Sequence, residues 1–169
     1  MMLEGRVALV TGASRGIGAA VARALAEAGV RLGLASRSGD DLGLDAVAQP
    51  CDVRDPEQVE SLVDATVARF GRLDILVANA GVGAYGPFLE LEAEHLDEMI
   101  DVNLKGTVYS VRAALPHLLA SDGADFSLLL AMQSLGVVAG VESIGITFHY
   151  LTTTPDKFVK TLRSRTEKF

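Results

Sequence analysis

Short, continuously apolar stretches alternate along the chain with longer stretches in which apolar residues recur every three or four positions. Continuous apolar runs are typical of strands buried in a parallel sheet, and the longer spacing is typical of helices that cover one. The apolar runs predict five strands, at residues 6–11, 30–35, 46–53, 73–78 and 126–132. This alternation predicts a doubly wound α/β fold with a parallel sheet and helices on both faces.

Two of the helical segments carry clear boundary signals. The first places Ile17, Val21 and Leu25 on one face of a helix that follows the first strand. The second begins at Asp55, a favourable N-cap, and Gln58 completes a capping-box pattern three residues later.

A third helical segment runs from about residue 92 to residue 120, and Pro116 is expected to kink its last turns. Its spacing predicts that five apolar side chains face the sheet: Leu104, Val108, Val111, Leu115 and Leu118.

Composition narrows the class of protein. The chain has 169 residues, of which 49% are hydrophobic, so we expect one domain over residues 1–169 with a substantial core. A formal net charge of -7 argues against nucleic acid and anionic membranes as partners.

No apolar run is long enough for a membrane span and no signal-peptide pattern is present, so a cytoplasmic location is expected. Cys51 is the only cysteine, which fits a reducing compartment. The three histidines do not have metal-ligand spacing, so no metal is expected.

The stretch "TGASRGIG" places Gly12, Gly16 and Gly18 where the first strand hands over to the first helix. A helix N-terminus presents unsatisfied N–H groups and the positive end of the helix dipole. Glycines at this position let the backbone turn tightly and approach a pyrophosphate closely. The stretch therefore predicts a phosphate-binding loop.

With three further stretches, "CDVRD" from Cys51, "NAG" from Asn79 and "DVNLKG" from Asp101, this loop resembles the short-chain dehydrogenase/reductase family over about residues 5–131. The resemblance implies a Rossmann-like domain, NAD(P)-dependent oxidoreduction of a small alcohol or carbonyl compound, and a homo-oligomer.

The resemblance also implies where the cofactor binds. The pyrophosphate and ribose would be lined by Gly12, Ser14, Arg15, Gly16, Ile17 and Gly18. The adenine would contact Asp52 and Val53, and the floor beneath the cofactor would be formed by Asn79, Ala80 and Gly81. Two structural alternatives stay open: Asp52 could cap a turn, and Asn79 could pin neighbouring strands.

The end of the second strand favours NADP over NAD. Proteins that prefer NAD place a carboxylate about 20 residues after the glycines, where it binds the ribose hydroxyls. Here Ser36 and Arg37 occupy that place. A guanidinium can bind a 2′-phosphate with two nitrogens, and Arg15 adds a second cation. The alternative is that Arg37 is a solvated loop residue.

The catalytic residues of the family are only partly present. Members use a Tyr-x-x-x-Lys pair helped by a Ser and an Asn; Asn103 matches the Asn, but no tyrosine here has a lysine four residues later. Tyr150 is followed by Lys157 at seven, and residues 143–154 read better as a strand, with a closing helix from Pro155. Ser134 is a candidate for the catalytic Ser because it follows the fifth strand, with a plain surface serine as the alternative.

The segment 127–169 therefore departs from the family pattern, and the fold is expected to be truncated relative to the full family fold. Either the catalytic helix is deleted, or an unrelated tail follows a shortened dehydrogenase. Two functions are therefore expected as alternatives. The first is an NADP-dependent oxidoreductase whose catalysis is impaired, and the second is a non-catalytic NADP-binding module or inactive fragment that self-associates.

Overall fold

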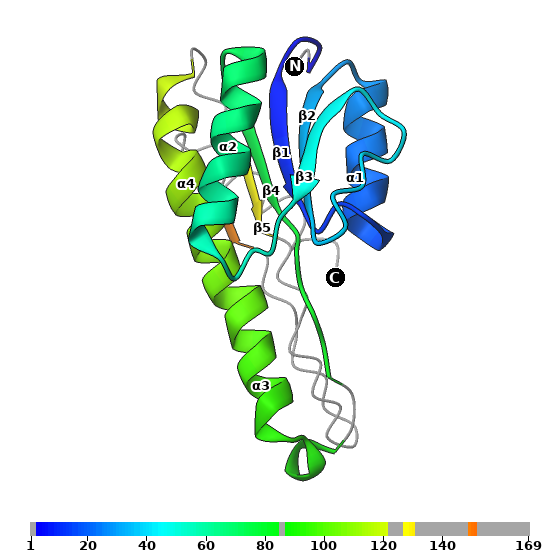
Figure 1. Ribbon diagram of the computed structural model, residues 1–169, viewed down its shortest axis with the longest axis vertical. Helices are drawn as coiled ribbons and strands as arrows, with labels where there is room; N and C mark the ends of the chain where they lie inside the picture. Colours follow the sequence, from blue (N-terminus) through cyan, green and yellow to red (C-terminus); the bar gives the residue numbers. More distant parts are fainter. Residues whose placement is uncertain (1–2, 85–86, 122–126, 131–148, 152–169) are drawn as a thin grey trace, which may run out of the picture.

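The computed structural model describes residues 3–84, 87–121, 127–130 and 149–151. Within these residues one sheet has the strand order β3-β2-β1-β4-β5-β6 (Figure 1). The strands are β1 (Val7–Thr11), β2 (Arg31–Ser36), β3 (Ala46–Pro50), β4 (Ile75–Ala78), β5 (Ser127–Leu130) and β6 (His149–Leu151). The first five strands pair in parallel and β6 pairs antiparallel to β5. The five strands predicted from the apolar runs are confirmed.

Helices cover both faces of the sheet, as the doubly wound prediction requires. Figure 1 shows α1 (Gly16–Glu27) on one face, and α2 (Pro56–Phe70) with α4 (Gly106–Ala120) on the other. A short 3-10 helix η1 (Phe88–Glu90) precedes α3 (Ala93–Met99), which continues through the π-helix η2 (Ile100–Lys105) into α4. In Figure 1, α3 projects beyond the ends of the strands. No helix in the described part of the chain has the length and apolar character needed to cross a bilayer.

The core has two halves, one on each face of the sheet. Val7 and Leu9 of β1 pack toward α2 and α4, whereas Ala8 and Val10 pack toward α1. All four side chains are fully buried. Burial on both faces is the reason that these strands are continuously apolar rather than alternating.

The predicted buried face of the third helical segment is confirmed for Leu118, which is buried, and for Val111, which packs against the core, but it is wrong for the other three residues. Leu104 and Val108 are each 53% exposed, and Leu115 is 36% exposed. The inward face of α4 instead carries small residues and ends in the buried Leu118. Small side chains let the helix approach closely: a Cβ at Gly106 would lie 2.6 Å from Cγ2 of Val53. The π-helix adds to the difference, because its wider turns rotate the positions that follow.

Helix α4 runs through Pro116 to Ala120. Of the expected strand over residues 143–154, His149–Leu151 is confirmed as a strand. Ser134, residues 143–148 and the closing helix expected from Pro155 lie outside the described residues.

Candidate functional site

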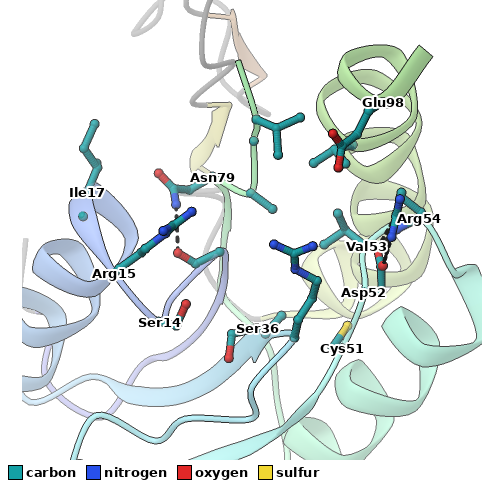
Figure 2. Close-up of a pocket in the computed structure, with 18 residues that line it drawn as sticks. Ser14, Arg15, Ile17, Ser36, Cys51, Asp52, Val53, Arg54, Asn79 and Glu98 are labelled. Carbon is teal, nitrogen blue, oxygen red and sulfur yellow. Dashed lines mark hydrogen bonds and ion pairs between the residues drawn. The ribbon is translucent and has the colours of Figure 1, made fainter. Parts of the chain in front are cut away.

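A pocket opens at the carboxyl ends of β1, β2 and β4 (Figure 2). The chain order of the strands reverses here, because β1 pairs with β2 on one side and with β4 on the other. In open α/β sheets such a reversal leaves a crevice that ligands use. Every residue that the sequence assigned to cofactor binding lines this pocket except Gly18.

The helix that begins at the pocket has no side-chain cap. Arg15 is the N-cap of α1 and has extended backbone angles, but its side chain accepts no hydrogen bond from the first turn, which also has no acidic residue. By contrast Asp55 caps α2 by accepting from the backbone N–H groups of Glu57 and Gln58. The first-turn N–H groups of α1 are therefore left for a ligand, and the helix dipole favours an anion there.

The glycines of this loop have different tasks. Gly16 lines the pocket at a φ of +59°, and a Cβ added to it would meet no atom within 4 Å, so the missing side chain leaves open space at the start of α1. Gly18 lies beneath the loop, where a Cβ would come within 2.2 Å of the Gly12 carbonyl oxygen. Gly18 thus allows close packing of helix and loop rather than contact with the pocket.

Asn79 fastens the end of β4 to the end of β1. Its side-chain Nδ2 donates to the carbonyl oxygens of Thr11 and Gly12 at 3.1 and 3.3 Å, and the Thr11 hydroxyl oxygen accepts from the backbone N–H groups of Asn79 and Ala80. The alternative role of pinning neighbouring strands is thus one that Asn79 performs. Its Oδ1 is buried without a hydrogen-bond partner among the described residues. Buried polar atoms are rarely left so, and a donor on a ligand would satisfy it.

The residues present therefore fit a dinucleotide. The open space at Gly16 and the uncapped first turn of α1 suit a pyrophosphate, and the unpartnered Oδ1 of Asn79 suits a donor group on the ligand. Ile17 is 59% exposed beside the pocket, an apolar surface for a flat ring.

Asp52 is held by Arg54 at one end of the pocket. The Arg54 Nε donates to both carboxylate oxygens of Asp52 at 3.0 Å, and Nη2 donates to Oδ2 at 2.5 Å (Figure 2). The backbone N–H of Arg54 also donates to Asp52 Oδ1 at 3.0 Å, which is the turn-capping role left open by the sequence. These hydrogen bonds hold the pKa of Asp52 below its usual value, with burial opposing them and Arg37 adding attraction. Asp52 is therefore ionised at neutral pH.

Ser36 and Arg37 behave differently although they are neighbours. Ser36 is buried, and its hydroxyl oxygen accepts from the backbone N–H of Gly39 at 3.1 Å. Arg37 is exposed and lines the pocket. Within residues 3–84 and 87–121, its guanidinium makes no hydrogen bond or ion pair. It is thus positioned for an anionic group of a ligand.

Cys51 also lines the pocket, in surroundings that disfavour its thiolate form. Burial, with smaller effects from Asp52 and Asp55, raises the pKa of Cys51 to about 11. The reactive form of cysteine is the thiolate, which is scarce at neutral pH when the pKa is this high.

Of the three candidate catalytic residues, Asn103 and Tyr150 lie in the part of the chain that the structure describes. Asn103 is buried in η2, where its Oδ1 accepts from Val82 N at 2.8 Å and its Nδ2 donates to Val82 O at 2.9 Å. Asn103 thereby fixes the chain just after β4. Tyr150 lies in β6, opposite Leu129 of β5. Ser134 lies outside the described residues.

The sequence interpretation missed several lining residues: Ala35, Cys51, Arg54, Val82, Glu98 and Val102. The first four adjoin residues that were assigned, so proximity in the chain could have found them. Val102 likewise adjoins Asn103 within "DVNLKG", whereas Glu98 carries no local signal and reaches the pocket through the tertiary structure. Among the residues that the structure describes, no three His, Cys, Asp or Glu side chains gather so as to hold a metal ion.

Residues 6–134 match the family model described as short chain dehydrogenase. The D-threitol dehydrogenase of Mycolicibacterium smegmatis is 40% identical over 132 residues, which cover 72% of this chain and 50% of that protein. The chain spans about half the length of the curated relatives it matches.

Solved structures match to a similar extent. An alcohol dehydrogenase from the archaeon Thermococcus sibiricus, complexed with 5-hydroxy-NADP, is 40% identical with a TM-score of 0.64, over 70% of this chain and 55% of that one. A carveol dehydrogenase from Mycobacterium avium, in complex with NAD, is 33% identical with a TM-score of 0.67, over 75% of this chain and 55% of that one.

Proposed function

Because the chain belongs to the short-chain dehydrogenase family, we propose that its pocket binds NADP in preference to NAD and serves the oxidoreduction of a small alcohol or carbonyl compound. In this proposal residues 1–169 form one Rossmann-like dinucleotide-binding domain that works in the cytoplasm, and residues 127–169 are its divergent C-terminal segment.

The uncapped N-terminus of α1 is the observation that carries the proposal. Its first turn faces the pocket with no side chain to satisfy it, and Gly16 leaves the adjoining space open. The cofactor would carry the hydride when bound: its reduced form would donate it to a carbonyl compound and its oxidised form would accept it from an alcohol. The chain's own residues would hold its phosphates at α1, its adenine at Asp52 and Val53, and its remaining half above Asn79 and Gly81.

The preference for NADP is supported by the charges at the end of β2. The position at the end of β2 where a carboxylate would repel a 2′-phosphate is taken by Ser36, and Arg37 follows it; both line the pocket. Arg15 lines the same pocket. Related structures carry NADP derivatives or NAD, so the preference rests on the residues of this chain.

Titration of the chain with NADP and with NAD tests this proposal. We expect tighter binding of NADP, and we expect Arg37→Asp to reverse the preference, at a cost to NADP binding on the order of 1–3 kcal/mol for the lost charge-assisted contact. Arg23→Asp makes the same charge change outside the pocket and should leave the ratio of the two dissociation constants unchanged. Equal affinity of the parent chain for both cofactors would contradict the preference.

A second function, a non-catalytic NADP-binding module, is favoured by one observation. None of the tyrosines Tyr85, Tyr109 and Tyr150 has a lysine four residues later, so the pair that moves the substrate proton in the family is missing. General acid–base catalysis contributes about 10²–10⁴-fold.

We therefore expect very weak or absent carbonyl reduction. Steady-state assays with generic carbonyl substrates, on the parent and on Tyr150→Phe, decide between the two functions. Ordinary turnover that is lost in this variant would show that Tyr150 is paired with a lysine and that the chain is an active reductase.

A further inference from the structure

Five charged side chains line the pocket, and one of the arginines among them determines which charges are already paired within the protein. Three arginines, Arg15, Arg37 and Arg54, and two carboxylates, Asp52 and Glu98, line it. Of these arginines, Arg54 is the one tied into an ion pair within residues 3–84 and 87–121, through its contact of 2.5 Å with Asp52.

The fork formed by Arg54 uses both oxygens of Asp52. Two guanidinium nitrogens and the backbone N–H of Arg54 all donate to this one carboxylate. A planar guanidinium matches a carboxylate in this way, and such two-nitrogen contacts are geometrically specific. The loop is further fixed because Asp52 N donates to Gln58 Oε1 at 2.9 Å, and Gln58 Nε2 donates to Asp55 Oδ2 at 2.7 Å.

Arg37 is the other cation that acts on Asp52. It attracts this carboxylate electrostatically, yet it forms no hydrogen bond or ion pair with any residue in ranges 3–84 and 87–121. A flexible exposed arginine beside an unpaired carboxylate would form an ion pair with it, and its charge would then no longer be available to a ligand. Arg54 prevents an ion pair between Arg37 and Asp52, because its own guanidinium already binds both oxygens of that carboxylate.

We propose that Arg54 is a specificity-determining positioning residue. By binding both carboxylate oxygens of Asp52, it leaves Arg37 available to a phosphate on the adenosine ribose. The inference rests on the proposed function, since it concerns the same pocket and the same preference for NADP. It assigns to Arg54 a selective effect: loss of Arg54 weakens NADP more than NAD, because only NADP carries the phosphate that Arg37 would contact.

Calorimetric titration of the full chain with NADP and with NAD tests the inference. In Arg54→Gln we expect the NADP affinity to fall roughly three- to tenfold more than the NAD affinity, as for a partly exposed charge-assisted contact. Arg54→Lys keeps the charge without the fork, and should keep more of the preference than Arg54→Gln. Arg69→Gln is the matched control, because Arg69 pairs with Asp45 outside the pocket.

A second variant separates this effect from simple damage to the loop. In an Asp52→Asn background the carboxylate that would capture Arg37 is gone, so adding Arg54→Gln should leave the ratio of the two dissociation constants unchanged. Thermal melts confirm that each variant is folded; Arg54 has a side chain that is 43% exposed, so little loss of stability is expected.

The outcomes distinguish the inference from the function beneath it. Equal weakening of NADP and NAD in Arg54→Gln, or no change in either, would overturn the role of Arg54 while leaving NADP binding intact. Failure of the parent chain to bind either dinucleotide would overturn the proposed function, and the inference with it. Binding of both with equal affinity would overturn the NADP preference and the role of Arg54, but not dinucleotide binding.

Discussion

At the scale of single residues, the site is shaped by polar side chains that form hydrogen bonds with the backbone. Asn79 and Asn103 both use their amides in this way, Asn79 between β4 and β1 and Asn103 on Val82. An amide can donate and accept at once, so one asparagine can satisfy both the N–H and the C=O of a residue in a loop. The chain after β4 is thereby fixed although it has no strand partner of its own.

Replacing Asn103 tests this role. Asn103→Ala leaves both polar groups of Val82 without these partners, so we expect a loss of about 1–3 kcal/mol in the free energy of unfolding. Asn103→Asp keeps the acceptor but sets a carboxylate oxygen against the Val82 carbonyl, and should destabilise at least as much. Urea unfolding followed by circular dichroism measures both variants. A change in Asn103→Ala smaller than about 0.5 kcal/mol, as for an ordinary surface substitution, would show that Val82 does not depend on Asn103.

Asp74 gives a second prediction at this scale, at the end of the sheet away from the pocket. Burial alone would raise the pKa of Asp74, but hydrogen bonds from Arg72, from Val7 N at 2.9 Å and from the Ser121 hydroxyl at 2.7 Å outweigh it, and its pKa is lowered. A carboxylate with a lowered folded-state pKa stabilises the fold above its unfolded pKa of about 3.9 and loses that contribution as the pH falls through the folded value.

The parent chain should therefore lose stability as the pH falls below about 4. Asp74→Asn should be less stable than the parent at pH 7, and the difference should shrink in acid, because protonation removes the same charge from the parent. Thermal melts between pH 7 and pH 3 measure the difference. A difference that stays constant over this range would mean that the charge of Asp74 contributes nothing to folding.

At the scale of elements, the hydrophobic pattern predicted the strands well and one helix face badly. Buried parallel strands are recognisable because both faces lie in a core, so the whole run is apolar. In α4 the pattern is ambiguous, because apolar residues occur on both faces while the inward face is built from Gly106, Ser110 and Ala114. Close approach selects small side chains there, and the π-turn that precedes α4 has no signature in the spacing of apolar residues.

The N-terminus of α1 has no side-chain cap whereas that of α2 has one, and this difference leads to a prediction about stability and binding. Arg15 occupies the N-cap position of α1, but its side chain makes no capping hydrogen bond. Because serine is a favourable N-cap, Arg15→Ser should stabilise α1 by about 0.5–1 kcal/mol. The same change should weaken NADP binding, because the serine side chain competes for the first-turn N–H groups and a cation is lost. Asp55→Ala is the matched control: it removes the cap of α2 and should cost about 1 kcal/mol.

Thermal melts with and without NADP measure both effects. If Arg15→Ser raised the stability of the free chain and left NADP affinity unchanged, the first turn of α1 would not be the anion site.

At the scale of the whole molecule, the site draws on segments that are far apart in the chain. The glycine loop, the end of β2 and the stretch after β3 were each recognisable, because phosphate and adenine contacts come from short local patterns. Glu98 was not, since its place at the pocket depends on where α3 projects after the packing of η2 and α4 on the sheet. Residues of this kind can be identified only from the tertiary structure.

The same packing leaves an apolar stripe on the outer side of the η2–α4 rod, formed by Ile100, Leu104, Val108, Leu115 and Leu119. These side chains are 36–63% exposed, and their spacing of four and seven residues places them along one face. Exposed apolar stripes of this length are uncommon on monomers and mark contact surfaces. A helix face can pair with its own copy about a two-fold axis, which makes self-association the expected outcome.

Sedimentation at micromolar concentration should therefore report a dimer or larger species for the parent chain. Val108→Glu places a charge in the middle of the stripe, where burying it against a second copy is costly, so this variant should sediment as a 17.8 kDa monomer. Ala24→Glu adds the same charge to the exposed side of α1, on the other face of the sheet, and should sediment like the parent. If the parent chain sedimented as a monomer and melted cooperatively, the apolar stripe would not mediate self-association. If both variants dissociated, the association would depend on net charge rather than on this surface.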